Sequence, residues 1–195
     1  MNLPNKLTLL RIAIIPIFVG VFYLPFPGSA LHTPHSALLY AASGVFILAY
    51  VTDAFDGYLA RRRNQVTDFG KLMDPMADKL LTTAALIMLA AYGMIHPAAV
   101  IIILSREFII SALRLVCIEK GVVVAASGWG KLKTVSQAVS VPAVMVTYAA
   151  AAQFDWVPRE TLYVADALVW ISAVLAVISA VDYLYKNRKI LKRVK

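Results

Sequence analysis

Six long apolar runs divide this chain, and they restrict its possible folds more than any other feature. They cover approximately Leu9–Phe26, Ser36–Thr52, Leu80–Ile95, Pro97–Ile118, Val135–Ala152 and Leu162–Leu184. A helix that crosses a bilayer needs about 20 apolar residues, and about 17 are tolerated. The 195 residues are 61% hydrophobic and 15% charged, so a soluble domain of this composition would leave large apolar patches in water. We therefore predict an all-α integral membrane protein with six transmembrane helices, built as a single domain over residues 1–195.

The basic residues predict how these helices are oriented. Of the 19 Lys and Arg residues, all except Arg159 fall on one side of the membrane if the N-terminus is cytoplasmic. Cytoplasmic segments carry the excess of Lys and Arg, so both termini are predicted to be cytoplasmic. The fourth run contains Arg106, Glu107 and Arg114. Charges inside a span face a cavity or a partner, so we expect a polar, cytoplasm-facing cavity beside this run.

Four aspartates lie within a short stretch of this apolar chain. They occur in the pattern Asp53-x2-Asp56-Gly57-x2-Ala60-Arg61-x8-Gly70-x3-Asp74-x3-Asp78. At the centre of a bilayer each aspartate would cost about 2.5–3.5 kcal/mol if left unpaired. The second and third apolar runs reach spanning length only if these polar ends are helical too. The spacing fits that expectation, because the members of each half fall on one face of an α-helix.

The two halves of the pattern predict a helical hairpin at the cytoplasmic surface. A short polar turn, Arg62–Thr67, separates them, so their acidic faces can meet. Facing carboxylates repel unless they are protonated or bridged by cations, and all-oxygen ligands suit hard divalent ions. Asp53, Asp56, Asp74 and Asp78 could hold two such ions, which would clamp a diphosphate. The alternative is a purely structural pair of acidic helix ends, neutralised by neighbouring Arg and Lys residues.

Small and basic residues accompany the aspartates. Gly57 and Ala60 add no bulk, so a ligand could approach that helix closely, and Arg61 could bind a phosphate oxygen. Asn5 and Thr8, at the start of the first run, are candidates for contacts with a nucleotide or phosphate; equally, they could form only an amphipathic start to the helix.

The stretch from Asp53 to Asp78 resembles, without departure, the pattern of the CDP-alcohol phosphatidyltransferases, a family of membrane enzymes. This resemblance implies that the first three aspartates chiefly bind two metal ions, Mg²⁺ or Mn²⁺. It also implies that Asp78 contributes to metal binding and serves as the general base. Gly57, Ala60, Arg61 and Gly70 would shape the CDP site. The family fold has six transmembrane helices and is commonly a homodimer.

The identity of the acceptor alcohol depends on other residues. Glu107, Ser111 and Arg114 form a polar stripe at helical spacing, as do Lys133, Gln137 and Ser140. An acceptor that carries its own phosphate would account for the basic groups Arg106, Arg114, Lys131 and Lys133. The alternative is internal pairing of Arg106 or Arg114 with Glu107, because charges inside membranes often pair with one another.

Two segments, Arg106–Arg114 and Pro4-Asn5-x2-Thr8-x2-Arg11, resemble bacterial phosphatidylglycerophosphate synthases. This resemblance implies CDP-diacylglycerol as donor, sn-glycerol 3-phosphate as acceptor and a place in the bacterial cytoplasmic membrane. It also implies that the protein is surrounded by membrane lipid and that it binds no nucleic acid. Two alternatives remain open: a related enzyme that uses inositol phosphate, serine or phosphatidylglycerol, and a divalent-cation transporter. The acids cluster at one surface without a second, repeated half, which is unlike a transporter site.

Overall fold

The computed structural model describes residues 3–23, 36–62, 68–119 and 128–193. Within these ranges the chain forms six α-helices and no strand. Their bounds are α1 Leu3–Tyr23, α2 Ser36–Arg62, α3 Asp68–Ala91, α4 Pro97–Glu119, α5 Gly128–Gln153 and α6 Glu160–Arg193. Side chains are described over 12–23, 36–52, 79–117 and 128–188.

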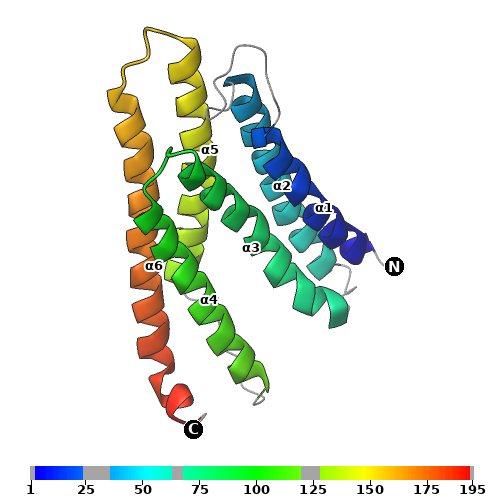
Figure 1. The fold of residues 1–195 in the computed structure, drawn as a ribbon. Coiled ribbons are helices and arrows are strands. Elements are labelled where there is room, and N and C mark those ends of the chain that lie inside the picture. The colour runs from blue at the N-terminus through cyan, green and yellow to red at the C-terminus, as the bar shows by residue number, and fades with distance from the viewer. Residues whose placement is uncertain (1–2, 24–35, 63–67, 120–127, 194–195) are drawn as a thin grey trace.

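The helices form a closed bundle in which each packs against two neighbours around the ring. α1 contacts α2 and α3, α5 contacts α2 and α6, and α4 contacts α3 and α6. α3 also contacts α5 across the middle of the bundle. Consecutive helices run in opposite directions, so the start of α1 and the end of α6 lie at the same end (Figure 1). The end of α2 and the start of α3 lie at that end too.

Helix boundaries follow from local chemistry, most clearly between α3 and α4. Gly93 has a φ of 68°, and the N–H groups of Gly93 and Met94 donate to the carbonyls of Ala90 and Leu89 at 3.0 and 2.9 Å. This is the glycine-terminated C-cap that ends many helices. His96 then caps α4, since its Nδ1 accepts a bond from the Ala98 N–H at 3.2 Å. The turn is therefore rigidly built.

This turn is also fastened to other helices. The His96 N–H donates to Asp166 of α6 at 3.3 Å, and the Tyr92 hydroxyl donates to the Phe22 carbonyl of α1 at 2.7 Å. The Tyr92 and Phe22 rings lie 5.6 Å apart. The sequence favours helix pairing or interfacial placement, rather than catalysis, for Asp166 and Asp182. Asp166 does link α6 to this turn, whereas Asp182 pairs within α6, with Lys186 one turn later at 2.7 Å.

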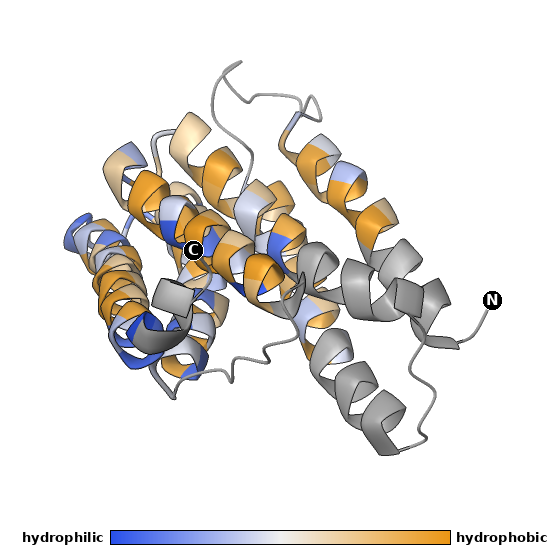
Figure 2. Cartoon of the chain, turned by 90° about the horizontal axis from the view of Figure 1, so that it is seen from below, coloured by the Kyte–Doolittle hydropathy of each residue, from blue (hydrophilic) through white to orange (hydrophobic). Residues whose placement is uncertain are grey.

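The distribution of apolar side chains is unlike that of a soluble protein. Large apolar residues are buried inside the bundle, with Phe18, Phe46 and Leu89 fully so, but others are exposed along all six helices. In Figure 2 hydrophobic residues make up much of the coloured length of the helices, with hydrophilic residues interspersed. Among the residues with described side chains, the buried polar and charged ones are Ser43, Glu107, Lys133, Gln137, Ser140, Ser172 and Ser179. An apolar exterior around an interior with charges is the pattern of a protein solvated by lipid.

Most, but not all, of the predicted spans match the helices. The expectation that the acidic ends of the second and third runs are helical is confirmed, since α2 continues to Arg62 and α3 begins at Asp68. The third run was placed too far toward the C-terminus, because the chain leaves α3 at Ala91 and turns at Gly93. By length and composition, α5 and the Glu160–Arg188 part of α6 could each cross a membrane; the apolar helical segments described in α1, α2 and α3 are shorter.

Candidate active site

The acidic residues lie where two consecutive helices adjoin. Asp53 and Asp56 belong to the C-terminal part of α2, and Asp74 and Asp78 to the N-terminal part of α3. Only residues 63–67 separate these helices, so Arg62 and Asp68 can be no more than about 20 Å apart. The helical backbone places each pair of carboxylates about one turn apart on its own helix.

The side chains of residues 53–78 lie outside those that the structure describes. The meeting of the four carboxylates, and the parts assigned to Gly57, Ala60, Arg61 and Gly70, therefore remain predictions. The same holds for Asn5 and Thr8, which belong to α1 but whose side chains are likewise outside the described set.

A cluster of charged side chains surrounds Glu107 in the interior of the bundle. The Glu107 carboxylate is paired with Lys133 of α5, with Arg106 of α4 at 3.2 Å and with Lys79 of α3 at 3.7 Å. Only 11% of the Glu107 side chain and 4% of the Lys133 side chain is exposed. We call these four residues the Glu107 cluster. It contains three cations and one carboxylate; Arg106 and Lys133 are largely buried, and Lys79, with 38% of its side chain exposed, lies at the edge of the cluster.

Hydrogen bonds fix the cluster to four helices. The Lys79 ammonium donates to the Ser111 hydroxyl, which itself donates to the Glu107 carbonyl at 2.6 Å. Arg106 donates from Nη2 to the Ser179 hydroxyl of α6 at 2.6 Å. Each charged side chain of the cluster therefore has at least one partner on another helix. The positions of Arg106 and Lys133 are therefore set by contacts inside the bundle.

Several buried donors near this cluster have no acceptor among the described residues. They are Arg106 Nε, Arg114 Nε and Gln137 Nε2. A buried polar group without a hydrogen bond costs about 1–3 kcal/mol. Gln137 lies one turn beyond Lys133 on the buried face of α5, and Arg114 lies two turns beyond Glu107 on α4. An anionic or polyhydroxyl ligand would supply the missing acceptors.

The structure brings together some of the predicted acceptor-binding residues but not all of them. Arg106 and Lys133 meet at Glu107, and Arg114, partly buried, follows on the same side of α4. Lys131 is exposed, and two residues of helix place it on roughly the opposite face of α5 from buried Lys133. The pairing of Arg106 with Glu107, which the sequence left open as an alternative, is present.

Sequence reasoning missed two members of this arrangement. The sequence indicated Lys79 only as a cation that could neutralise the aspartates, yet its ammonium binds Ser111 on α4. Its position next to Asp78 was the feature of the sequence that could have placed it near the site. Ser179 was not singled out, and nothing in its sequence surroundings connects it with Arg106, 73 residues away. Ser140 and Ser172 also meet, at 3.3 Å, which extends the polar interior between α5 and α6.

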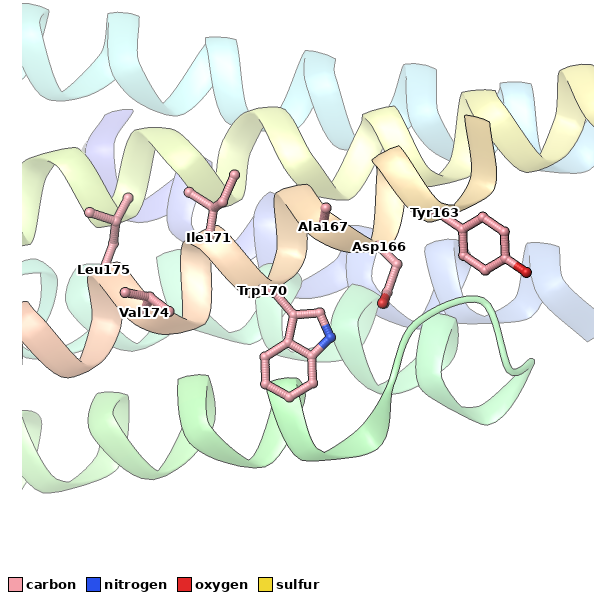
Figure 3. Close-up of a pocket in the computed structure, with 7 residues that line it drawn as sticks. All are labelled: Tyr163, Asp166, Ala167, Trp170, Ile171, Val174 and Leu175. Carbon is pink, nitrogen blue, oxygen red and sulfur yellow. The ribbon is translucent and has the colours of Figure 1, made fainter. Parts of the chain in front are cut away.

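An open cavity of about 500 Å³ lies along the first half of α6, far along that helix from Ser179. It is lined by Tyr163, Asp166, Ala167, Trp170, Ile171, Val174 and Leu175, all from the same helix (Figure 3). The only carboxylate there, Asp166, already accepts a bond from His96. The groove offers no converging set of donors, so the chemistry is better placed at the acidic helix ends and the Glu107 cluster.

Comparison with known proteins identifies the family of this chain. The family model of the CDP-alcohol phosphatidyltransferases matches residues 1–179. A Bacillus subtilis (strain 168) protein named CDP-diacylglycerol–glycerol-3-phosphate 3-phosphatidyltransferase is 42% identical, over 98% of this chain and 97% of its own length. An Escherichia coli (strain K12) protein of the same name is 40% identical, over 96% and 95%. One from Sodalis glossinidius (strain morsitans) is 38% identical, over 96% of each chain. The chain belongs to the CDP-alcohol phosphatidyltransferase family of membrane enzymes.

Proposed function

We propose that the protein transfers the phosphatidyl group of CDP-diacylglycerol to sn-glycerol 3-phosphate, giving phosphatidylglycerophosphate and CMP. Relatives that carry the name of this reaction match nearly the whole chain at about the same length. The aspartate pattern falls in the adjoining ends of α2 and α3, which suits a phosphotransferase that works on a diphosphate. The product would be a precursor of anionic phospholipid.

The four aspartates are the proposed metal ligands. A set of carboxylate oxygens fits Mg²⁺ or Mn²⁺, and the helical placement of the pairs Asp53–Asp56 and Asp74–Asp78 on adjoining helix ends fits a shared site. When bound, two such ions would neutralise the diphosphate and stabilise charge on the leaving CMP. Gly57, Ala60, Arg61 and Gly70, with Asn5 and Thr8, would shape and bind the CDP group.

Asp78 is the proposed general base. It would accept the proton of the acceptor hydroxyl, whose oxygen forms a bond to the lipid-bearing β-phosphorus as the bond from that phosphorus to the oxygen of CMP breaks. Positioning of the acceptor then decides the rate, because an oriented reactant replaces a bimolecular step with an effectively unimolecular one.

The Glu107 cluster is the observation that carries the choice of acceptor. Its cations Lys79, Arg106 and Lys133 outnumber its one carboxylate, and Lys79 follows Asp78 directly on α3. An acceptor with a doubly charged phosphate would balance that excess and place its hydroxyl near the base. Arg106 Nε and Arg114 Nε, which have no partner among the described residues, would gain acceptors. Lys131, being exposed, would contribute only charge at the mouth of the site.

We also propose the arrangement in the membrane. The six helices would cross the cytoplasmic membrane with both termini and the acidic helix ends on the cytoplasmic side, where nucleotides and glycerol 3-phosphate occur. The alternation of helix direction and the excess of basic residues support this orientation. The working unit would be a homodimer, as the family resemblance implies.

The test is CMP release by the purified protein in detergent–lipid micelles that contain CDP-diacylglycerol and Mg²⁺ or Mn²⁺. Parallel reactions would contain glycerol 3-phosphate, inositol phosphate, serine or phosphatidylglycerol. Metal-dependent release with glycerol 3-phosphate alone is the expected result. Release with another acceptor would retain the chemistry and overturn the acceptor. No release with any acceptor, together with metal flux through liposomes, would favour transport instead.

A further inference from the structure

Glu107 is the single carboxylate on which cations of three helices converge among the described residues. Lys79 comes from α3, Arg106 from α4 itself and Lys133 from α5. The residue is 9% exposed, and Arg106 and Lys133 are also largely buried, so solvent is a poor substitute for Glu107 as the partner of these two cations. Without its charge, the largely buried Arg106 and Lys133 and the partly exposed Lys79 would face one another at short range, and like charges repel strongly where solvation is poor.

The contacts of Glu107 also fix directions. Its Oε1 binds Arg106 Nη1 at 3.2 Å while Ser179 holds Nη2 of the same guanidinium at 2.6 Å, so the plane of Arg106 is set from both sides. The third donor, Nε, is left buried and without a partner among the described groups. Lys133 lies on the buried face of α5 with Glu107 as its partner. Two cations are therefore held in place, and one presents an unused donor.

The cluster is connected to the acidic hairpin through α3. Lys79 follows Asp78, and its ammonium is bound by Ser111 and Glu107 on α4. Successive residues of a helix are 1.5 Å apart along the axis. The level of Asp78 relative to Arg106 and Lys133 therefore depends on the contact between Lys79 and Glu107. This contact links the proposed base to the proposed phosphate-binding cations.

We propose that Glu107 is a positioning residue for the acceptor: it holds Lys79, Arg106 and Lys133 in an array that binds the acceptor phosphate at the level of Asp78. Glu107 touches neither the lipid nor the reacting atoms, and acts through the cations. This inference rests on the proposed function, since it takes a phosphorylated acceptor as the ligand. It assigns to Glu107 a role in acceptor affinity rather than in binding of CDP-diacylglycerol.

The experiment compares Glu107→Gln and Glu107→Asp with wild type by steady-state CMP release, varying each substrate in turn. For Glu107→Gln we expect the KM for glycerol 3-phosphate to rise about 10-fold or more, as for loss of a charged hydrogen-bond partner. The KM for CDP-diacylglycerol should change less than about 2-fold. Glu107→Asp keeps the charge on a shorter side chain and should restore part of the acceptor affinity.

A double-mutant cycle tests whether Glu107 acts through its cations. Lys133→Met alone should raise the KM for the acceptor, and adding Glu107→Gln should raise it by less than the product of the single effects, because contacting residues are not additive. Asp182→Asn, which removes another paired carboxylate, is the matched control and should leave both KM values at wild-type level. Independent, multiplicative effects of the two substitutions would overturn the proposal.

Failure of this inference can be told apart from failure of the proposed function. CMP release by the wild-type protein with glycerol 3-phosphate tests the function. If the protein uses a different phosphorylated acceptor, that acceptor takes the place of glycerol 3-phosphate in the KM comparison. Equal changes in both KM values, or an unchanged acceptor KM, would show that Glu107 has only a structural part. If Glu107→Gln does not fold, Glu107→Asp is read alone by the same criterion: an effect confined to the acceptor supports the proposal, and an effect on both substrates contradicts it.

Discussion

At the scale of single residues, the interior of this bundle is organised around charges that would be costly if left alone. Glu107 and Lys133 are nearly inaccessible, and removing one partner of such a pair leaves an uncompensated buried charge, at a cost of about 3–5 kcal/mol. Replacing both partners with apolar residues often costs nothing, so pairing alone does not explain why a membrane bundle would contain them. A binding role for the surplus cations does.

Asp78 is the residue whose loss should most specifically affect chemistry. We expect Asp78→Asn to lower turnover by about 10²–10⁴-fold, the usual contribution of a general base, while binding of CDP-diacylglycerol stays measurable. CMP release and a direct binding titration in micelles would be compared. Asp155→Asn, at an exposed position after α5, is the control and should be active. Normal turnover of the Asp78 variant would remove this residue from the mechanism.

Arg114 should distinguish the two substrates. Its Nε is buried without a partner among the described residues, as expected of a group that awaits an anion. Arg114→Ala should raise the KM for glycerol 3-phosphate about 10-fold, with a smaller effect on the KM for the lipid. Arg159→Ala, at an exposed position in the connection before α6, should change neither. An equal change for both substrates would contradict the acceptor assignment.

At the scale of elements, the bundle depends on where helices stop as well as on where they pack. The α3–α4 turn is closed by Gly93, capped by His96 and tied to α1 and α6 through Tyr92 and Asp166. This turn lies at the opposite end of α3 from the aspartates (Figure 1). It therefore anchors the helix that carries Asp74 and Asp78 without touching the site.

Gly93 offers a direct test of that anchor. A side chain at a left-handed backbone position costs about 1–2 kcal/mol, so Gly93→Ala should lower the midpoint of thermal unfolding in detergent. Gly20→Ala is the matched control, because Gly20 lies inside α1 and an added Cβ there meets nothing within 4 Å. That control should be neutral or slightly stabilising, since Ala favours a helix over Gly. Equal midpoints of thermal unfolding for Gly93→Ala and Gly20→Ala would show that a side chain at position 93 does not strain the turn.

At the scale of the whole molecule, the arrangement is that of a protein whose solvent is lipid. Exposed apolar side chains occur on all six described helices, while the charged Glu107 and Lys133 are buried between them. Because α2 and α3 run in opposite directions, their acidic ends share one end of the bundle with both termini. A substrate with two acyl chains and a nucleotide needs such a position, close to both lipid and water.

Cysteine labelling would test the proposed orientation. With Cys117, which is buried, replaced by Ser, single cysteines would be placed as Arg159→Cys and Arg188→Cys, both at exposed positions. A membrane-impermeant maleimide applied to cells with a permeabilised outer envelope should label position 159 but not 188. Position 188 should react only once the cytoplasmic membrane is opened. The reverse pattern would place both termini outside.

The sequence predicted the helices well because helix formation is local. Hydropathy and spacing indicated six helices, including the polar ends of α2 and α3, since backbone bonds reach only four residues along the chain. The same locality explains the misplaced end of the third run. Tyr92 to Ile95 are apolar on average, but one glycine with a positive φ turns the chain there.

What the sequence by itself determined is the membrane class of the protein, the helical character of its segments and the spacing of the aspartates along two of them. Only the tertiary structure decided which charges meet. Lys133 and Glu107 are 26 residues apart, Lys79 and Ser111 are 32 apart, and Arg106 and Ser179 are 73 apart. Each helix alone presents several faces to its neighbours, and the face that turns inward is fixed by the packing of all six. The same packing buried Lys133 and left Lys131 exposed on the other side of α5.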